Sequence, residues 1–181
     1  MHITGADMNR ILGILACSAL GLSLAGPAAA EPANLLGVFG NWSAYTAGSG
    51  PNQTCYALSK PRATRPAGTK RDAVYLMISD WPSRKVKAEP QIIYGYQGKE
   101  DGTAALAVGS DKFPFFIRNN GKEASSWLQQ LDDNERLIDA MHNGVSAVAS
   151  GTSSRGTKTS DTYSLEGFND ALAKIHAACS M

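Results

Sequence analysis

Two histidines, His142 and His176, are the residues after position 31 that could act as general acids or bases near neutral pH. Their spacing does not match H-E-x-x-H, and no C-x-x-C pair accompanies them, so the pattern does not favour a zinc site. No serine lies in the G-x-S-x-G motif of a nucleophile elbow. We therefore predict no catalytic residue, no metal ligand and no cofactor, and we expect the histidines to cap or pack helices.

Other motifs with chemical potential are equally weak. Asp132 and Asp133 are adjacent, so their carboxyl groups cannot face each other across a substrate as a glycosidase pair does. The Gly-Tyr-Gln-Gly run at 95–98 has neither the G-K-[ST] nor the following helix of a phosphate-binding loop. The sequence favours a protein that is not an enzyme. A hydrolase with an unrecognised site remains the alternative.

The first thirty residues have the layout of a secretory signal peptide. Arg10 supplies the positive start, residues 11–24 form an apolar run, and three alanines at 28–30 suit a signal peptidase. We expect cleavage there, leaving one domain over residues 31–181 in the periplasm, secreted, or in the cell envelope of a Gram-negative bacterium. No later stretch is long and apolar enough to predict a transmembrane segment in the mature chain.

The cysteines support this interpretation. Cleavage would remove Cys17 and leave Cys55 and Cys179. In an oxidising compartment an even pair indicates a disulfide. The other interpretation is two free thiols, one of them a nucleophile. We favour the disulfide because neither cysteine lies in a motif that carries a base.

Basic residues cluster in two predicted loops. Residues 60–88 hold eight basic and two acidic residues, an excess of six positive charges. These loops are either an anion-binding interaction surface or merely solvated, and the second is the commoner role of such charge runs. No aromatic residues alternate with the charges, so we do not expect nucleic acid binding. The candidate surface comprises Lys60, Arg62, Arg65, Lys70, Arg71, Arg84, Lys85 and Lys87, with Arg155 as a further candidate whose simpler role is in a turn.

Short alternating segments separated by turn residues predict the fold. We expect strands at 38–45, 53–59, 73–79, 91–96, 103–108, 112–118, 123–128, 145–151 and 157–164. A short helix should begin near the acidic residues 132–135 and end at Gly144. Apolar residues at helical spacing between 165 and 179 predict a second helix. The pattern indicates a mainly β fold, an antiparallel β-sandwich or partly open barrel with two short helices, the C-terminal one packed across the sheet.

An ordered series of short motifs resembles the invasion-associated locus B family of exported bacterial proteins. The series is FGNW at 39–42, CYALS at 55–59, KRDAVY at 70–75, IYGY at 93–96, LIDAM at 137–141 with Gly144, GTSSRGT at 151–157, and DTYSLEGF at 161–168 with Ala171 and Cys179. The resemblance covers essentially all of residues 31–181. It implies a small secreted protein whose family name is tied to the entry of some pathogens into host cells. It supplies no catalytic or cofactor residues.

Together these observations predict an exported, non-enzymatic module of the envelope that binds a macromolecule through a sheet edge or a loop face. The expected partner is a protein or envelope component of unknown identity, and the family name adds the host cell surface. A carrier of a small ligand inside the β fold is a further alternative, which a large enclosed cavity would support.

Overall fold

The structure is a computed structural model, and it describes residues 32–181. Cys17 and the predicted signal peptide lie outside the described residues. Among the described residues, no helix has the length and apolar character needed to cross a membrane.

Within residues 32–181, eleven antiparallel strands form one continuous sheet in the order β1-β2-β3-β5-β6-β9-β8-β7-β10-β11-β4. The strands are β1 (Asn34–Phe39), β2 (Trp42–Ala47), β3 (Thr54–Ser59), β4 (Ala63–Arg65), β5 (Tyr75–Trp81), β6 (Val86–Ile93), β7 (Ala104–Val108), β8 (Asp111–Asn120), β9 (Glu123–Leu128), β10 (Ser146–Thr152) and β11 (Lys158–Ser164). The sheet is not closed, because β1 and β4 form its two ends. The predicted class is confirmed: a mainly antiparallel β fold with two helices.

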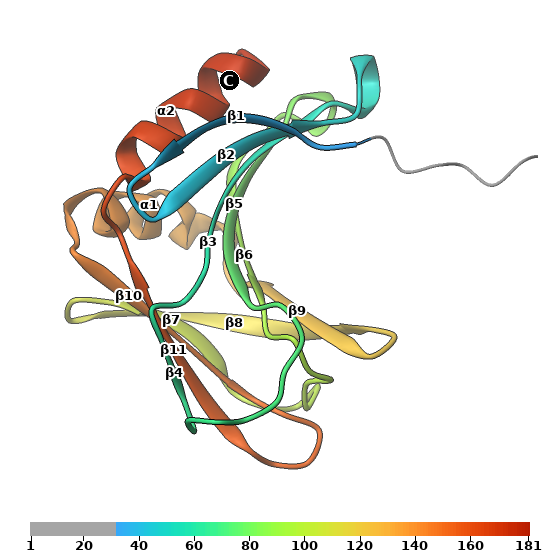
Figure 1. Ribbon diagram of the computed structural model, residues 1–181, viewed down its shortest axis with the longest axis vertical. Helices are drawn as coiled ribbons and strands as arrows, with labels where there is room; N and C mark the ends of the chain where they lie inside the picture. Colours follow the sequence, from blue (N-terminus) through green and yellow to red (C-terminus); the bar gives the residue numbers. More distant parts are fainter. Residues whose placement is uncertain (1–31) are drawn as a thin grey trace, which may run out of the picture. The chain divides into compact units, whose positions relative to one another are not determined.

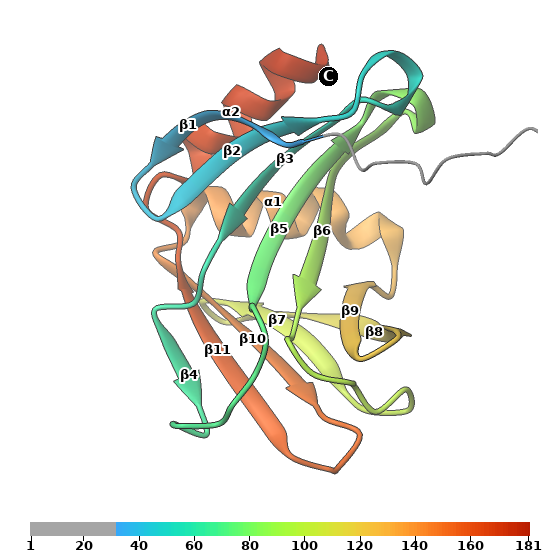
Figure 2. The same ribbon diagram turned by 45° about the vertical axis from the view of Figure 1, so that its right-hand side comes forward.

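The C-terminal helix α2 (Phe168–Cys179) packs on the sheet, as its apolar spacing predicts. Its buried residues include Phe168 and Ile175, and they face β2, β3 and β5. The Phe168 ring lies 5.0 Å from the ring of Trp42, whose indole nitrogen donates to the Ser164 carbonyl. Figures 1 and 2 show α2 running along β1 and β2, with the first helix α1 (Asn134–Asn143) below it.

Two glycines fix the turn that precedes α2 against the first hairpin. Gly40 has φ of +52° in the β1–β2 turn, and Gly167 has φ of +85° before α2. A Cβ at Gly40 would lie 2.6 Å from the Glu166 carbonyl oxygen, and one at Gly167 would collide with the Phe39 carbonyl. Any larger residue at either position would therefore separate the two turns.

Three sequence-based predictions are wrong in detail. The strand expected at 91–96 is β6, which begins at Val86, ends at Ile93 and includes Lys87 of the second basic loop. The expected strand at 38–45 is a hairpin, because Phe39 and Trp42 pair across a tight turn that Gly40 permits. The basic loop at 60–71 contains the short strand β4, which pairs with β11 and has three exposed residues. Such a strand has no buried face, so it lacks the apolar alternation that identifies strands in a sequence.

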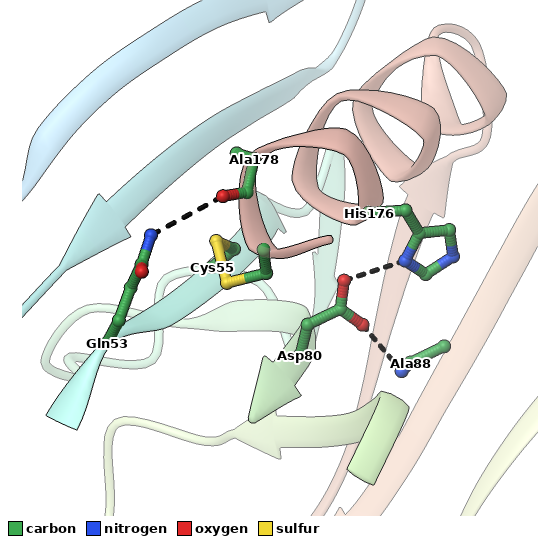
Figure 3. Close-up of a disulfide and its surroundings, with 7 residues drawn as sticks. Gln53, Cys55, Asp80, Ala88, His176 and Ala178 are labelled. Carbon is green, nitrogen blue, oxygen red and sulfur yellow. Dashed lines mark hydrogen bonds and ion pairs between the residues drawn. A yellow bond between two sulfur atoms is a disulfide. The ribbon is translucent and has the colours of Figure 1, made fainter. Parts of the chain in front are cut away.

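The structure confirms the disulfide between Cys55 and Cys179, which joins β3 to the last turn of α2 (Figure 3). The two residues are 124 positions apart, and both are buried. Beside the bond, the Gln53 amide donates to the carbonyl of Ala178 at 3.4 Å. The bond therefore holds the C-terminal end of the chain on the sheet.

Candidate functional site

A polar cleft of about 500 Å³ lies where four connecting segments meet. These are the loop that enters β5, the segment after β6, the β8–β9 turn and the β10–β11 turn. The lining residues are Thr69, Lys70, Arg71, Asp72, Gly95, Tyr96, Gln97, Lys122, Ser153, Ser154, Arg155, Thr157 and Thr159. We call this feature the basic cleft, because four of its residues are cationic and one is acidic.

A buried ion pair anchors one wall of the basic cleft. The guanidinium of Arg71 donates two hydrogen bonds to the carboxylate of Asp161 in β11, one of them of 2.9 Å from Nη1 to Oδ2. The side chain of Arg71 is 5% exposed and that of Asp161 is fully buried. These hydrogen bonds raise the pKa of Arg71 above its usual value, so its charge persists at every ordinary pH. Its other three N–H groups form no hydrogen bond with residues 32–181.

The aromatic side of the basic cleft is also held by hydrogen bonds. The Tyr96 hydroxyl lies 2.7 Å from the Thr159 hydroxyl, and the Arg71 guanidinium lies 5.8 Å from the centre of the Tyr96 ring. Burial raises the pKa of Tyr96, so the phenol stays neutral at physiological pH. A neutral phenol next to a guanidinium adds a hydrogen-bonding group without reducing the positive charge of the cleft.

The other three cations are not neutralised. No carboxylate in residues 32–181 forms an ion pair with Lys70, Lys122 or Arg155. Four lining cations against Asp72 and the underlying Asp161 leave a net charge of +2. Lysine, arginine and hydroxyl donors around one cavity suit a carboxylate or phosphate group of a ligand.

The structure places the predicted basic residues in three separate groups. Lys70, Arg71 and Arg155 line the basic cleft, although 84 positions separate Arg71 from Arg155. Lys60, Arg62 and Arg65 are exposed near or on β4, outside the cleft lining. Arg84, Lys85 and Lys87 follow β5, whose seven residues separate them from Arg71 by about 20 Å.

Sequence reasoning missed Lys122. It lies in the turn between β8 and β9, next to Gly121, and nothing in the adjacent residues marks it as functional. Only the folding of the sheet brings this turn beside the β10–β11 turn that carries Arg155. No local sequence pattern predicts that these two hairpin turns lie beside the same cleft.

The two histidines line a different pocket, between α1 and α2. His142 Nδ1 is 2.6 Å from the side-chain oxygen of Asn169, and His176 Nδ1 is 2.7 Å from Oδ2 of Asp80. The residues lining this pocket include no serine, threonine or cysteine, the usual nucleophiles of histidine-dependent hydrolases. In residues 32–181, no three His, Cys, Asp or Glu side chains form a group able to hold a metal ion.

Comparison with known protein families identifies the family of the chain. A family model described as "Invasion associated locus B (IalB) protein" matches residues 42–176, about three quarters of the sequence. The chain belongs to the IalB family. Lys70, Arg71, Lys122 and Arg155 all lie inside the matched region.

A solved structure supports the fold of this IalB protein. The crystal structure of invasion associated protein B from Bartonella henselae is similar with a TM-score of 0.56 and 12% sequence identity, covering 80% of this chain and 98% of that one. At this identity the similarity shows the fold alone. The comparison with curated proteins found no match.

Proposed function

We propose that this chain is an exported, non-enzymatic binding protein that holds an acidic macromolecule of the cell envelope in the basic cleft. A single observation carries the proposal: Lys70, Lys122 and Arg155, from three separate segments, line one cavity with no paired carboxylate among residues 32–181. Bringing like charges together costs free energy, so an arrangement of this kind is suited to an anionic ligand.

The geometry supports a preformed site. The Arg71–Asp161 pair and the Tyr96–Thr159 hydrogen bond hold the walls of the cleft in place without a ligand. Serine and threonine hydroxyls surround the cations and can bind the oxygens of a carboxylate or phosphate. Preorganised donors lower the entropic cost of binding.

Export is part of the same proposal. Removal of the first thirty residues would leave residues 31–181 as one mature domain in the periplasm or outside the cell. A disulfide between Cys55 and Cys179 suits an oxidising compartment of this kind.

Site-specific photo-crosslinking tests the proposal. A photoreactive amino acid replaces Gln97, which lines the cleft, in the full-length chain expressed in a Gram-negative host. A matched strain carries it at Val145, which is 86% exposed and outside the cleft. After irradiation, we expect adducts with an acidic envelope macromolecule at Gln97 only.

Charge reversal completes the test. The combined substitutions Lys70→Glu, Lys122→Glu and Arg155→Glu should abolish those adducts, whereas Lys60→Glu with Lys85→Glu should preserve them. Adducts that form equally at Val145, or that survive the triple reversal, would refute the basic cleft as the binding site. Raising the salt concentration should weaken the same adducts, since exposed charges are screened.

A further inference from the structure

A second cavity lies on β6, β8 and β9 and is lined mainly by aromatic and apolar side chains. Its volume is about 720 Å³, and it extends from Trp81 at the end of β5 to Leu131 ahead of α1. We call it the aromatic groove. The pairing register aligns Gln91, Trp127 and Phe116 on neighbouring strands, so these side chains share one face of the sheet. Ile92, on the opposite face of β6, is fully buried in the core.

Large aromatic surfaces form the groove. The rings of Phe116 and Trp127 lie 6.0 Å apart at an angle of 31°, and Phe116 is 41% exposed. Trp81 holds a fixed orientation because its indole nitrogen donates to Glu89 at 2.9 Å and the Arg84 guanidinium lies 4.3 Å from its ring centre. Two of the three tryptophans of the chain thus line a single open cavity.

The groove carries no net charge. Its two ionised residues, Arg84 and Glu89, form an ion pair of 3.3 Å with each other. The side-chain amide of Gln91 is free, since none of residues 32–181 forms a hydrogen bond with it. The site therefore offers aromatic faces and a planar amide, with polar atoms of Glu89 and Arg84 at its side. A neutral ligand with both apolar and hydrogen-bonding faces complements this set.

The aromatic residues of the groove lie where the strands are paired. Gln91 pairs with Trp127, and Trp127 pairs with Phe116, so a ligand on this face meets their side chains. Ligand selection there comes from the aromatic rings and the amide.

We propose that the aromatic groove is a binding site for a neutral saccharide. One face of a pyranose ring presents C–H groups with partial positive charge, which suit the negative face of an indole or phenyl ring. Its hydroxyls act as donors and acceptors, which the Gln91 amide and the Glu89 carboxylate match. The volume of the groove accommodates one or two sugar units. This site is separate from the basic cleft, and its ligand class does not depend on the function proposed there.

Tryptophan fluorescence tests the assignment. The purified protein, with its disulfide intact, is titrated separately with chitotetraose, cellotetraose and maltotetraose. Because Trp81 and Trp127 line the groove while Trp42 is fully buried, we expect at least one of these saccharides to change the emission saturably. Gln91→Ala should weaken that binding by about tenfold, and Trp127→Ala should weaken it further.

Three controls separate binding at this groove from other effects. Val38→Ala, at a residue 64% exposed on β1, should leave the dissociation constant unchanged. The triple charge reversal of the basic cleft should also leave it unchanged, so the two proposals fail independently. Circular dichroism shows whether the Trp127→Ala protein is folded. If it is not, the effect of Gln91→Ala on the dissociation constant alone tests the site.

Two results would overturn the saccharide site. One is the absence of saturable binding by all three saccharides at millimolar concentration. The other is binding that Gln91→Ala does not weaken. Binding of an apolar peptide or a detergent in place of the saccharides would assign the groove to another ligand class and would equally refute the proposal.

Discussion

His176 contacts the buried carboxylate of Asp80 at 2.7 Å, one helical turn before the cysteine that ties α2 to the sheet. The other oxygen of Asp80 accepts a hydrogen bond of 2.8 Å from the Ala88 amide (Figure 3). Ala88 has φ of +53°, a conformation that a residue with a Cβ adopts only at a cost. Asp80 therefore stabilises two things together, the position of α2 and an unfavourable backbone conformation in β6.

Substitution at this pair should lower the stability of the fold. We expect His176→Ala to reduce the free energy of unfolding by about 1–3 kcal/mol, because a buried carboxylate oxygen loses its partner. Asp80→Ala should cost more, since the Ala88 amide is also left without an acceptor. Urea unfolding of both variants and of the double variant measures the coupling. Lys174→Ala, on the exposed side of α2, is the control, and a coupling energy near zero would contradict the proposed role of the pair.

The disulfide should contribute about 4 kcal/mol in the chain-entropy model, given the long loop it closes. Replacing Cys55 and Cys179 together by alanine should lower the free energy of unfolding by up to that amount. Mass spectrometry provides the direct test of the bond in the purified protein. Peptides containing Cys55 and Cys179 should gain alkyl groups only after reduction, and alkylation without a reductant would show free thiols.

Removing only one partner of the Arg71–Asp161 pair should strongly lower the free energy of unfolding. Arg71→Met leaves a buried carboxylate unpaired, and we expect a loss of about 3–5 kcal/mol. The double variant Arg71→Met with Asp161→Ala should lose less, because no unpaired charge remains. Arg84→Met removes a half-exposed pair and should cost at most about 1 kcal/mol. Equal losses in the single and double Arg71 variants would disagree with this account.

Two buried tyrosines should make the fold sensitive to alkaline pH. Burial raises the pKa of Tyr94 and of Tyr163 well above the ordinary value of 10.0. Well below pH 10 both phenols are protonated in the folded and unfolded states, so they add no pH dependence there. Above pH 10 the unfolded chain releases protons that the folded chain keeps, so stability should fall as pH rises. Tyrosinate absorbance should show these two of the six tyrosines titrating only on unfolding.

A matched pair of substitutions separates hydrogen bonding from burial. The Tyr94 hydroxyl lies 3.0 Å from the Ser126 hydroxyl and donates to the Ser150 carbonyl at 3.2 Å, whereas the Tyr163 hydroxyl has no partner among residues 32–181. Tyr94→Phe should therefore cost about 1 kcal/mol at neutral pH. Tyr163→Phe should be neutral or stabilising and should still reduce the alkaline loss of stability. Equal effects of the two changes would contradict this distinction.

The compartment can be determined by labelling intact cells with an amine reagent that does not cross membranes. Lys60, Lys70, Lys85 and Lys87 are all exposed, so the reagent can reach them wherever it meets the protein. Labelling only after the outer membrane is opened would place the protein in the periplasm. Labelling of closed cells would place it on the outer surface and favour a host partner.

The sequence alone predicted the fold class, the C-terminal helix, the disulfide and the family. Each depends on a local pattern: alternation in strands, helical spacing of apolar residues such as Phe168 and Ile175, an even cysteine count, and short motifs in order. Sequence patterns did not predict the strand β4 or the hairpin turn at Gly40. An edge strand without a buried face and a two-residue turn both leave little periodic signal.

Only the tertiary structure decided which functional groups meet. The sequence placed Lys70, Arg71 and Arg155 among nine candidates. It could not group them with Lys122, since their shared cleft depends on two hairpin turns brought together by the sheet. It likewise gave no sign that His176 would contact Asp80, or that Trp81 and Trp127 would share a groove. Local sequence patterns indicate which face of a helix or strand is buried. A binding site depends instead on contacts between residues far apart in the chain, and neither hydrophobic periodicity nor composition encodes those contacts.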